Sequence, residues 1–281
     1  MLWQRVVTAV VLLLVLLPAL FYPSPVPFSL VAMAFIAAGA WEWARLTGYG
    51  PVPALATGVL AAAACAVAWF GGLLDQPLPA LWVVAAVLWV LGGAWLLRGG
   101  PAALRSLPQP VRLVLGFVLL CLAWLAVAQA RAIGINFLLS VMALVWVADI
   151  GAYFAGRRWG GRWITRKLAP SISPGKSWEG VAGGMVGVLV VSMLWRWADA
   201  HWQADAPSIY THLAHTLHWL AVPAILALTA MSVAGDLLES LVKRVAGAKD
   251  SSALLPGHGG VLDRLDALLP TLPLALLFHA L

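Results

Sequence analysis

The chain has 281 residues, of which 63% are hydrophobic and only 10% are charged, and its mean hydropathy is +0.94. A soluble globular protein carries about 25% charged residues, so this composition excludes a water-soluble enzyme. The abundance of apolar residues also excludes a disordered chain. The net charge of +6 is carried by no soluble basic domain, so no nucleic-acid partner is expected, and we predict an integral membrane protein.

Stretches of roughly 20 apolar residues, the length that crosses a bilayer core of about 30 Å as a helix, recur along the whole chain. The breaks between them are rich in proline, glycine or charge. The predicted fold class is therefore all-α, a polytopic membrane protein with about nine transmembrane helices. The expected spans are Val6–Tyr22, Val26–Trp43, Val52–Phe70, Leu78–Leu97, Val111–Ala130, Phe137–Gly156, Gly180–Trp197, Leu217–Leu238 and Leu262–Leu281.

The distribution of basic residues predicts the orientation of these spans. If nine spans alternate between the two sides, every lysine and arginine except Arg131 and Arg196 falls on the side of the N-terminus. Cytoplasmic loops carry the excess of basic residues in membrane proteins. We therefore expect a cytoplasmic N-terminus and a C-terminus on the opposite side.

The first polar segment that interrupts the apolar pattern is Asp149–Tyr153, near the expected cytoplasmic end of the sixth span. An ionisable residue within a membrane helix costs about 2.5–3.5 kcal/mol, which makes Asp149 a candidate for function. The alternative is a purely structural carboxylate paired with Arg157 or Arg158.

The second segment, Ser171–Gly180, contains Gly-Lys-Ser just before the seventh span. A P-loop would need glycine five residues before Gly175, where the chain has Pro170, so a P-loop nucleotide site is excluded. A small-residue turn at a helix start, with a lysine and hydroxyls, remains a simple phosphate-binding arrangement. An ordinary capped turn would have the same pattern.

Two further segments place charges beside apolar helices. On a helix, Asp236, Glu239, Ser240 and Lys243 share one face because they are three or four residues apart. Glycines then surround His258 and let the backbone approach a ligand closely, before the charged run that begins at Asp263. A solvated surface loop would also be polar, but it would not need carboxylates and cations alternating so densely beside membrane helices.

These segments together favour phosphoryl or nucleotidyl transfer. Carboxylates at Asp149, Asp236, Asp250 and Asp263 offer the oxygen ligands that hard divalent cations prefer, and the nearby lysines and arginines can bind phosphate oxygens. Such reactions are catalysed mainly by positioning the phosphates and neutralising their charge.

The run from Ser240 to Asp266 resembles the signature of the phosphatidate cytidylyltransferases, also called CDP-diacylglycerol synthases. It reads Ser-x-Val-Lys-Arg-x₄-Lys-Asp-Ser-Ser-x₂-Leu-Pro-Gly-His-Gly-Gly-x₂-Asp-Arg-Leu-Asp. Ser173–Gly180 resembles the second motif of this family, with serine where threonine is common, and Asp149–Tyr153 and Trp41–Leu46 also resemble family segments. On this basis we expect residues 1–135 to form N-terminal transmembrane helices and residues 136–281 to form the catalytic region.

The resemblance implies that CTP and phosphatidic acid react to give CDP-diacylglycerol and pyrophosphate. It also implies Mg²⁺ as cofactor, a second cation such as K⁺, and a homodimer among membrane lipids in a bacterial-type inner membrane, with the active site facing the cytoplasm. The expected catalytic residues are Asp236, Asp263, Lys249, Lys243 and Arg264. The expected substrate-binding residues are Ser173, Gly175, Lys176, Ser177, Ser240, Arg244, His258, Gly259 and Gly260. The expected metal ligands are Asp236, Asp263, Asp250 and Asp149.

Two other classes of function fit part of this pattern. A CTP-dependent lipid kinase, or another lipid-phosphate transferase, would share the metal and the triphosphate site and differ only in its product. A transporter would also place charges among membrane helices, but broken helices at the bilayer midplane or inverted repeats would be expected, and the sequence shows neither.

Overall fold

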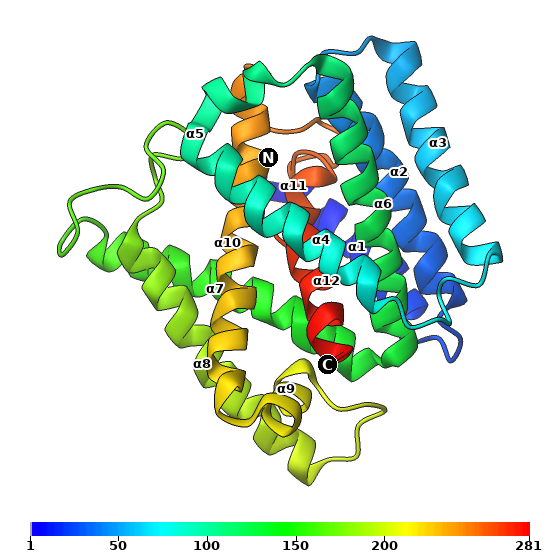
Figure 1. Ribbon diagram of the computed structural model, residues 1–281, viewed down its shortest axis with the longest axis vertical. Helices are drawn as coiled ribbons and strands as arrows, with labels where there is room; N and C mark the ends of the chain where they lie inside the picture. The colour runs from blue at the N-terminus through cyan, green and yellow to red at the C-terminus, as the bar shows by residue number, and fades with distance from the viewer. Residues whose placement is uncertain (1) are drawn as a thin grey trace.

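A computed structural model describes residues 2–281, and within that range the chain is helical and contains no strand (Figure 1). Two isolated antiparallel bridges, Ala169–Ser173 and Leu255–Gly259, each close a loop on itself. The predicted all-α fold is therefore confirmed.

Twelve α-helices are present in the described residues, together with a π-helical segment (Leu88–Gly92) and a short 3₁₀ turn (His218–Leu220). The helices are α1 (Leu2–Phe21), α2 (Val26–Leu46), α3 (Pro51–Phe70), α4 (Pro79–Val87), α5 (Gly93–Ser106), α6 (Gln109–Ile133), α7 (Ile135–Trp159), α8 (Trp178–His201), α9 (Ile209–Leu217), α10 (Ala221–Val245), α11 (Leu262–Leu265) and α12 (Leu268–His279).

Eight helical segments within residues 2–281 are long and apolar enough to cross a membrane. They match the first eight predicted spans, so the prediction of a polytopic membrane protein is confirmed. The fourth segment is longer than expected, because α4 continues through the π-helical segment into α5 as one stretch from Pro79 to Ser106. Gly100 kinks that stretch with a non-helical backbone (φ 59°).

The ninth predicted span, Leu262–Leu281, is not one continuous helix. It is divided into the single turn α11 and the 12-residue helix α12, which is about 18 Å long at 1.5 Å per residue and too short to cross a bilayer core. Gly235 of α10 allows this division, since a Cβ there would lie 2.4 Å from the Asp266 carbonyl oxygen. The junction between α11 and α12 therefore packs directly against α10.

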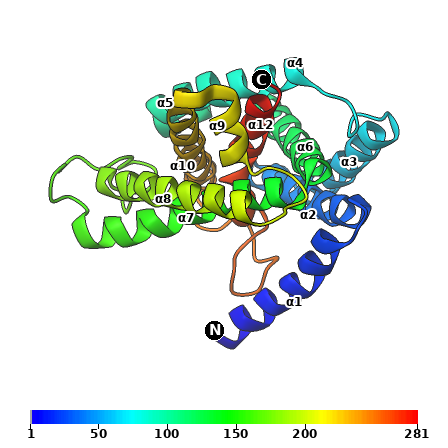
Figure 2. The same cartoon turned by 90° about the horizontal axis from the view of Figure 1, so that it is seen from below.

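Helix α12 lies in the middle of the bundle rather than at its edge (Figures 1 and 2). Its residues from Leu268 to Leu276 are buried, and it packs against α4, α6, α7 and α10. The short helix thus fills the centre of the molecule with apolar side chains and carries the preceding polar turn, α11, inside the bundle.

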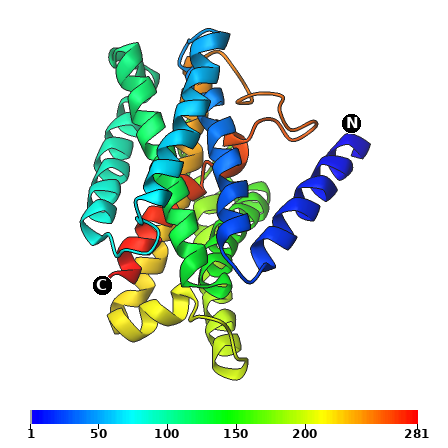
Figure 3. The same ribbon diagram turned by 90° about the vertical axis from the view of Figure 1, so that its right-hand side faces the viewer.

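Helix α1 leans away from the other helices (Figures 2 and 3). Its outer surface is apolar and exposed, as expected for a helix that faces lipid. The Thr8 hydroxyl donates a hydrogen bond to the Pro256 carbonyl at 2.8 Å, which links α1 to the loop before α11. A cavity of about 290 Å³ lies between α1 and the rest of the bundle.

Arg131, one of the two arginines outside the basic side of the sequence pattern, has a structural role at the end of α1. Its buried guanidinium donates to the carbonyl of Leu20 at 2.9 Å and to that of Tyr22 at 2.6 Å. Carbonyls at a helix C-terminus have no partner within the helix, and a cation there also complements the helix dipole. Arg131 therefore caps α1.

We expect Arg131→Met to lower the free energy of unfolding by about 2–4 kcal/mol, because it removes two charge-assisted hydrogen bonds and leaves carbonyls unpaired. Thermal unfolding of the purified protein in detergent measures this loss. Arg196→Gln is the matched control, since Arg196 is exposed and its replacement should change stability by less than about 0.5 kcal/mol. Equal stability of the two variants would contradict the capping role.

Candidate functional site

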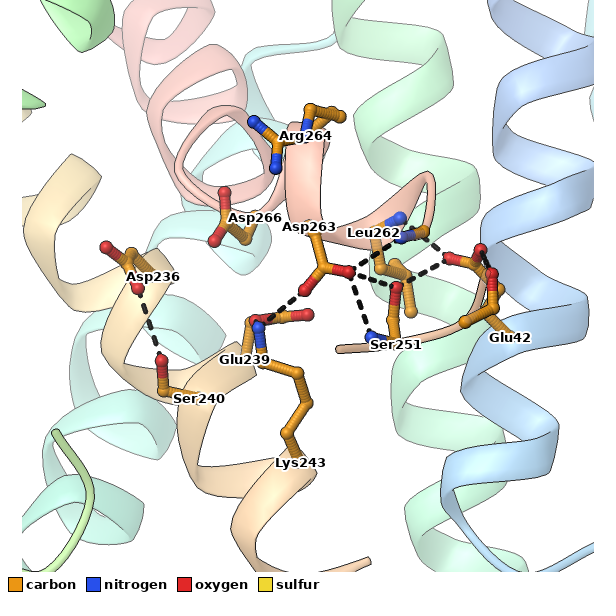
Figure 4. A network of polar contacts seen from close by, with 12 residues as sticks. Glu42, Asp236, Glu239, Ser240, Lys243, Ser251, Leu262, Asp263, Arg264 and Asp266 are labelled. Atoms are coloured by element: carbon orange, nitrogen blue, oxygen red, sulfur yellow. Dashed lines mark hydrogen bonds and ion pairs between the residues drawn. The ribbon is translucent and has the colours of Figure 1, made fainter. Parts of the chain in front are cut away.

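Helix α10 provides the base of the candidate site. Asp236, Glu239, Ser240 and Lys243 lie along one face of this helix (Figure 4), as the sequence spacing predicted. The Ser240 hydroxyl donates to Asp236 Oδ1 at 3.3 Å, and the Lys243 ammonium forms an ion pair with Glu239 one turn earlier. Contacts between side chains of α10 itself therefore already orient the polar groups on this face.

The Asp263 carboxylate, on α11, connects this face to the loop before it. Oδ1 accepts from Lys243 Nζ at 2.6 Å, and Oδ2 accepts from the Ser251 N–H (2.9 Å), the Ser251 hydroxyl (2.9 Å) and the Gly260 N–H (2.8 Å). Burial alone would raise the pKa of this carboxyl, but the hydrogen bonds from Lys243 and from two backbone N–H groups outweigh burial and lower the pKa of Asp263 to about 2. Asp263 is therefore ionised and held in one orientation.

Glu42 of α2 is a site residue that the sequence analysis did not select. Its side chain is completely buried. Its carboxylate accepts hydrogen bonds from the Ser252 hydroxyl (2.5 Å) and from the N–H groups of Val261 (2.9 Å) and Leu262 (2.7 Å). The Ser251 hydroxyl lies 3.1 Å from it and shares its single hydrogen between Glu42 and Asp263. Glu42 thus ties the loop that carries Asp263 to a helix more than 200 residues earlier. A carboxylate inside an apolar span was the signal, as for Asp149.

Gly260 permits this close approach. A Cβ at this position would lie 1.9 Å from the Ser251 hydroxyl oxygen and 2.5 Å from Glu42 Oε1. The neighbouring Gly259 has a positive φ of 82°, a conformation that L side chains rarely adopt. The glycines around His258 therefore let the loop fold against Glu42 and Asp263.

A polar cavity of about 390 Å³ lies between α7, α8 and α10. Lys176 Nζ contacts Asp236 Oδ2 at 2.5 Å across it, and Asp149 of α7 borders the same space. Three residues predicted from separate sequence segments are thus brought together. The cavity is lined by Asp149, Ala152, Tyr153, Gly156, Arg157, Gly175, Lys176, Ser177, Gly180, Val181, Val233 and Asp236.

The segment before α8 is a folded turn. The Ser177 hydroxyl accepts a hydrogen bond from the Gly180 N–H at 3.1 Å and caps α8. The Ser173 N–H donates to the Ala169 carbonyl at 2.8 Å, while Arg244 Nε of α10 donates to the Ile172 carbonyl at 3.2 Å. Arg244 therefore holds this turn against α10, and the turn presents Lys176 to the cavity.

Three predicted site residues lie apart from the cluster on α10. Lys249 and Asp250 are exposed on the loop that follows α10. The Arg264 guanidinium donates to the His258 carbonyl at 2.8 Å and borders the cavity beneath α1 instead. Conversely, the structure adds Glu239 and Asp266, which lie beside Asp236 and Asp263 (Figure 4).

The carboxylates fit a cation that is bound together with phosphates. In residues 2–281 no three His, Cys, Asp or Glu side chains form a metal cage of their own. Mg²⁺, however, is commonly held by one or two carboxylates with waters and substrate phosphates. Glu239 Oε1 is buried without a hydrogen-bond partner in the same residues, close to Asp236 and Asp263 (Figure 4). An unpaired buried carboxylate oxygen is costly unless a cation or proton compensates it.

Comparison with known proteins agrees with this geometry. Residues 3–281 match the model of a family described as the cytidylyltransferase family. The chain belongs to this family. The phosphatidate cytidylyltransferase of Pseudomonas aeruginosa is 38% identical over 289 residues, which cover 100% of this chain and 98% of that protein.

Further relatives match over about half of the chain. The phosphatidate cytidylyltransferase of Haemophilus influenzae is 44% identical over 146 residues, 52% of this chain and 46% of that protein. That of Staphylococcus epidermidis is 37% identical over 147 residues, 52% of this chain and 50% of that protein. The predicted family is thereby confirmed, and the chain is a cytidylyltransferase-family enzyme.

Proposed function

We propose that this membrane enzyme is a phosphatidate cytidylyltransferase, which converts CTP and phosphatidic acid into CDP-diacylglycerol and pyrophosphate. The observation that carries the proposal is the pairing of Asp236 with Lys176 and of Asp263 with Lys243, on elements that converge inside an apolar helix bundle. Carboxylates for a cation and ammonium groups for phosphates are what transfer between two anionic substrates requires. The family and the relatives support this choice of reaction.

The proposed reaction is a direct displacement. A phosphate oxygen of phosphatidic acid attacks the α-phosphorus of CTP, and the bond to the bridging oxygen of the β-phosphate breaks, so that pyrophosphate leaves. The attacking oxygen is already anionic at neutral pH, and no side chain has to remove a proton. Lys176 and Lys243 would bind phosphate oxygens, with Arg157 at the edge of the cavity.

Asp236 and Asp263 are the residues that would hold Mg²⁺. Asp149 borders the cavity opposite Asp236, Asp250 lies near the Asp263 loop, and either could assist with a second cation such as K⁺. When bound, Mg²⁺ would reduce the repulsion between the two substrates and stabilise the pyrophosphate that leaves. The residues themselves orient the site: Lys243 and Ser251 keep Asp263 in place, and Ser240 keeps Asp236 in place.

We also propose that the enzyme resides in the cytoplasmic membrane of a bacterium, with its N-terminus and site on the cytoplasmic side, and that it acts as a homodimer. The basic residues on the N-terminal side support this orientation. Chemistry supports it as well, because CTP is dissolved in the cytosol and phosphatidic acid presents its headgroup at the membrane surface.

Purified protein in detergent, supplied with Mg²⁺, CTP and phosphatidic acid, tests the proposed reaction. We expect pyrophosphate and CDP-diacylglycerol in equal amounts, identified by phosphate analysis and mass spectrometry. Formation of CDP with a newly phosphorylated lipid would instead identify a lipid kinase. If the folded protein consumes no CTP, both the cytidylyltransferase and the lipid kinase are excluded, and a transporter is favoured.

A further inference from the structure

The last turn of α7 and the loop that follows it carry an unusual density of cations. From position 157 to position 167 the chain has five exposed basic residues and no acidic one, and we call this segment the basic arm. Its cations are Arg157, Arg158, Arg162, Arg166 and Lys167. The ion pairs found within residues 2–281 involve none of these five side chains. Their charges are therefore not neutralised by carboxylates of the described chain.

Aromatic side chains accompany these cations. Trp159 and Trp163 stack with their ring centroids 6.1 Å apart and their planes at 17°, yet Trp163 remains 71% exposed. Ile164 beside them is also exposed. Tryptophan next to arginine is typical of segments that lie at a membrane–water interface, where the ring enters the headgroup region and the cation meets phosphates.

The arm has a fixed base. The buried Glu179 carboxylate accepts hydrogen bonds from the N–H groups of Trp163 and Ile164, both at 3.0 Å. The loop between α7 and α8 projects sideways beyond the helices (Figures 1 and 2). Its exposed side chains therefore extend beyond the bundle and do not pack over it.

We propose that the basic arm binds the headgroups of anionic phospholipids in the surrounding membrane. Charge complementarity favours this partner. The five unpaired cations complement the negative charge of the headgroups, and the exposed tryptophan pair suits the membrane–water interface. The arm continues into the polar cavity, since Arg157 belongs to both. It thus concentrates anionic lipids beside the opening of the site. Binding by the arm does not depend on which reaction the site performs.

A fluorescence measurement tests the arm without requiring turnover. Thr165→Cys, in a chain with Cys65→Ala and Cys121→Ala, places one environment-sensitive dye on the exposed arm. The protein is placed in nanodiscs of phosphatidylcholine with or without phosphatidylglycerol, and lipids with a nitroxide headgroup quench the dye. We expect stronger quenching in the anionic discs, and we expect 0.5 M NaCl to reduce the difference because salt screens exposed charges.

Arg162→Gln with Arg166→Gln should lower the ratio of bound to free arm by about 25-fold, which is about fivefold, or 1 kcal/mol, for each arginine. Arg98→Gln with Arg105→Gln is the matched control, because it removes two exposed arginines from helix α5, away from the arm; here we expect a change of less than about twofold. Equal quenching in neutral and anionic discs, or the same loss in both double variants, would refute the proposal. Quenching that changes only when CTP or a nucleic acid is added would assign the arm to a soluble polyanion instead.

Discussion

Asp263→Asn is expected to reduce the rate of CDP-diacylglycerol formation at least about 100-fold while leaving the protein folded. The asparagine carbonyl can still accept from the N–H groups of Ser251 and Gly260, so the loop keeps its shape. The amide nitrogen, however, replaces the oxygen that accepts from Lys243. The site then loses one negative charge that a cation would need. Removing one preorganised electrostatic contact to a transition state costs about 10²–10³ in rate in other enzymes, and we expect a loss of similar size here. Steady-state assay and thermal unfolding, done on the same preparation, measure both effects.

Asp75→Asn serves as the control for this experiment. Asp75 is exposed in the turn between α3 and α4, and its replacement removes one carboxylate without touching the site. We expect its rate to stay within about twofold of the unchanged enzyme. If the Asp263→Asn enzyme were as active as this control, Asp263 would have no role in the reaction.

Glu42→Gln should be the most damaging substitution outside the cluster on α10. Each carboxylate oxygen of Glu42 lies within hydrogen-bond distance of one hydroxyl and one backbone N–H. The amide nitrogen of glutamine would replace one of these oxygens, and because it is a donor it cannot accept a hydrogen bond from that N–H. An unpaired buried donor costs about 1–3 kcal/mol, and weaker hydrogen bonds to a neutral acceptor add to that. We expect a loss of about 3 kcal/mol in the free energy of unfolding and at least a tenfold lower rate.

Thermal unfolding and the same lipid assay measure these two losses. Thr57→Val is the matched control, because the buried Thr57 hydroxyl bonds only to the Pro53 carbonyl in its own helix. Its removal should cost less than about 1 kcal/mol and should leave the rate unchanged. If Glu42→Gln unfolds and reacts like Thr57→Val, then Glu42 does not position the loop that carries Asp263.

The apolar spans of this chain could be predicted because lipid imposes a length and a composition on each helix. The ninth predicted span, Leu262–Leu281, is interrupted in the sequence by Pro270 and Pro273, which left its full crossing open, and the structure divides it into α11 and α12. Pro270 has no N–H to donate to the Asp266 carbonyl, which favours a break there. Gly235 of α10 then lets the α11–α12 junction approach closely, which is a contact between distant segments. No count of apolar residues within Leu262–Leu281 contains that information.

Some residues of the candidate site could be predicted from the sequence, and others could not. Asp236 and Lys243 follow from helical spacing, and Asp149 and Lys176 follow from their charge at a membrane boundary. The structure gathers Asp149, Lys176 and Asp236 around the cavity between α7 and α10, and it pairs Lys243 with Asp263 of α11. Sequence reasoning could not tell that the Arg264 guanidinium points to the His258 carbonyl instead. Glu42 stands in the Trp41–Leu46 segment and inside an apolar span, but its partners lie about 210 residues away, and only the fold brings them near.

The bond between Glu42 and the last loop constrains how the protein is made. Helix α2 leaves the ribosome early, whereas the Leu262 N–H that Glu42 accepts from comes 220 positions later. During synthesis the Glu42 carboxylate therefore has to stay without these partners until the loop before α11 has been made, because its bond to Leu262 spans 220 positions. A nascent chain that stops before the loop preceding α11 contains helices α1 to α10 and still has no assembled site.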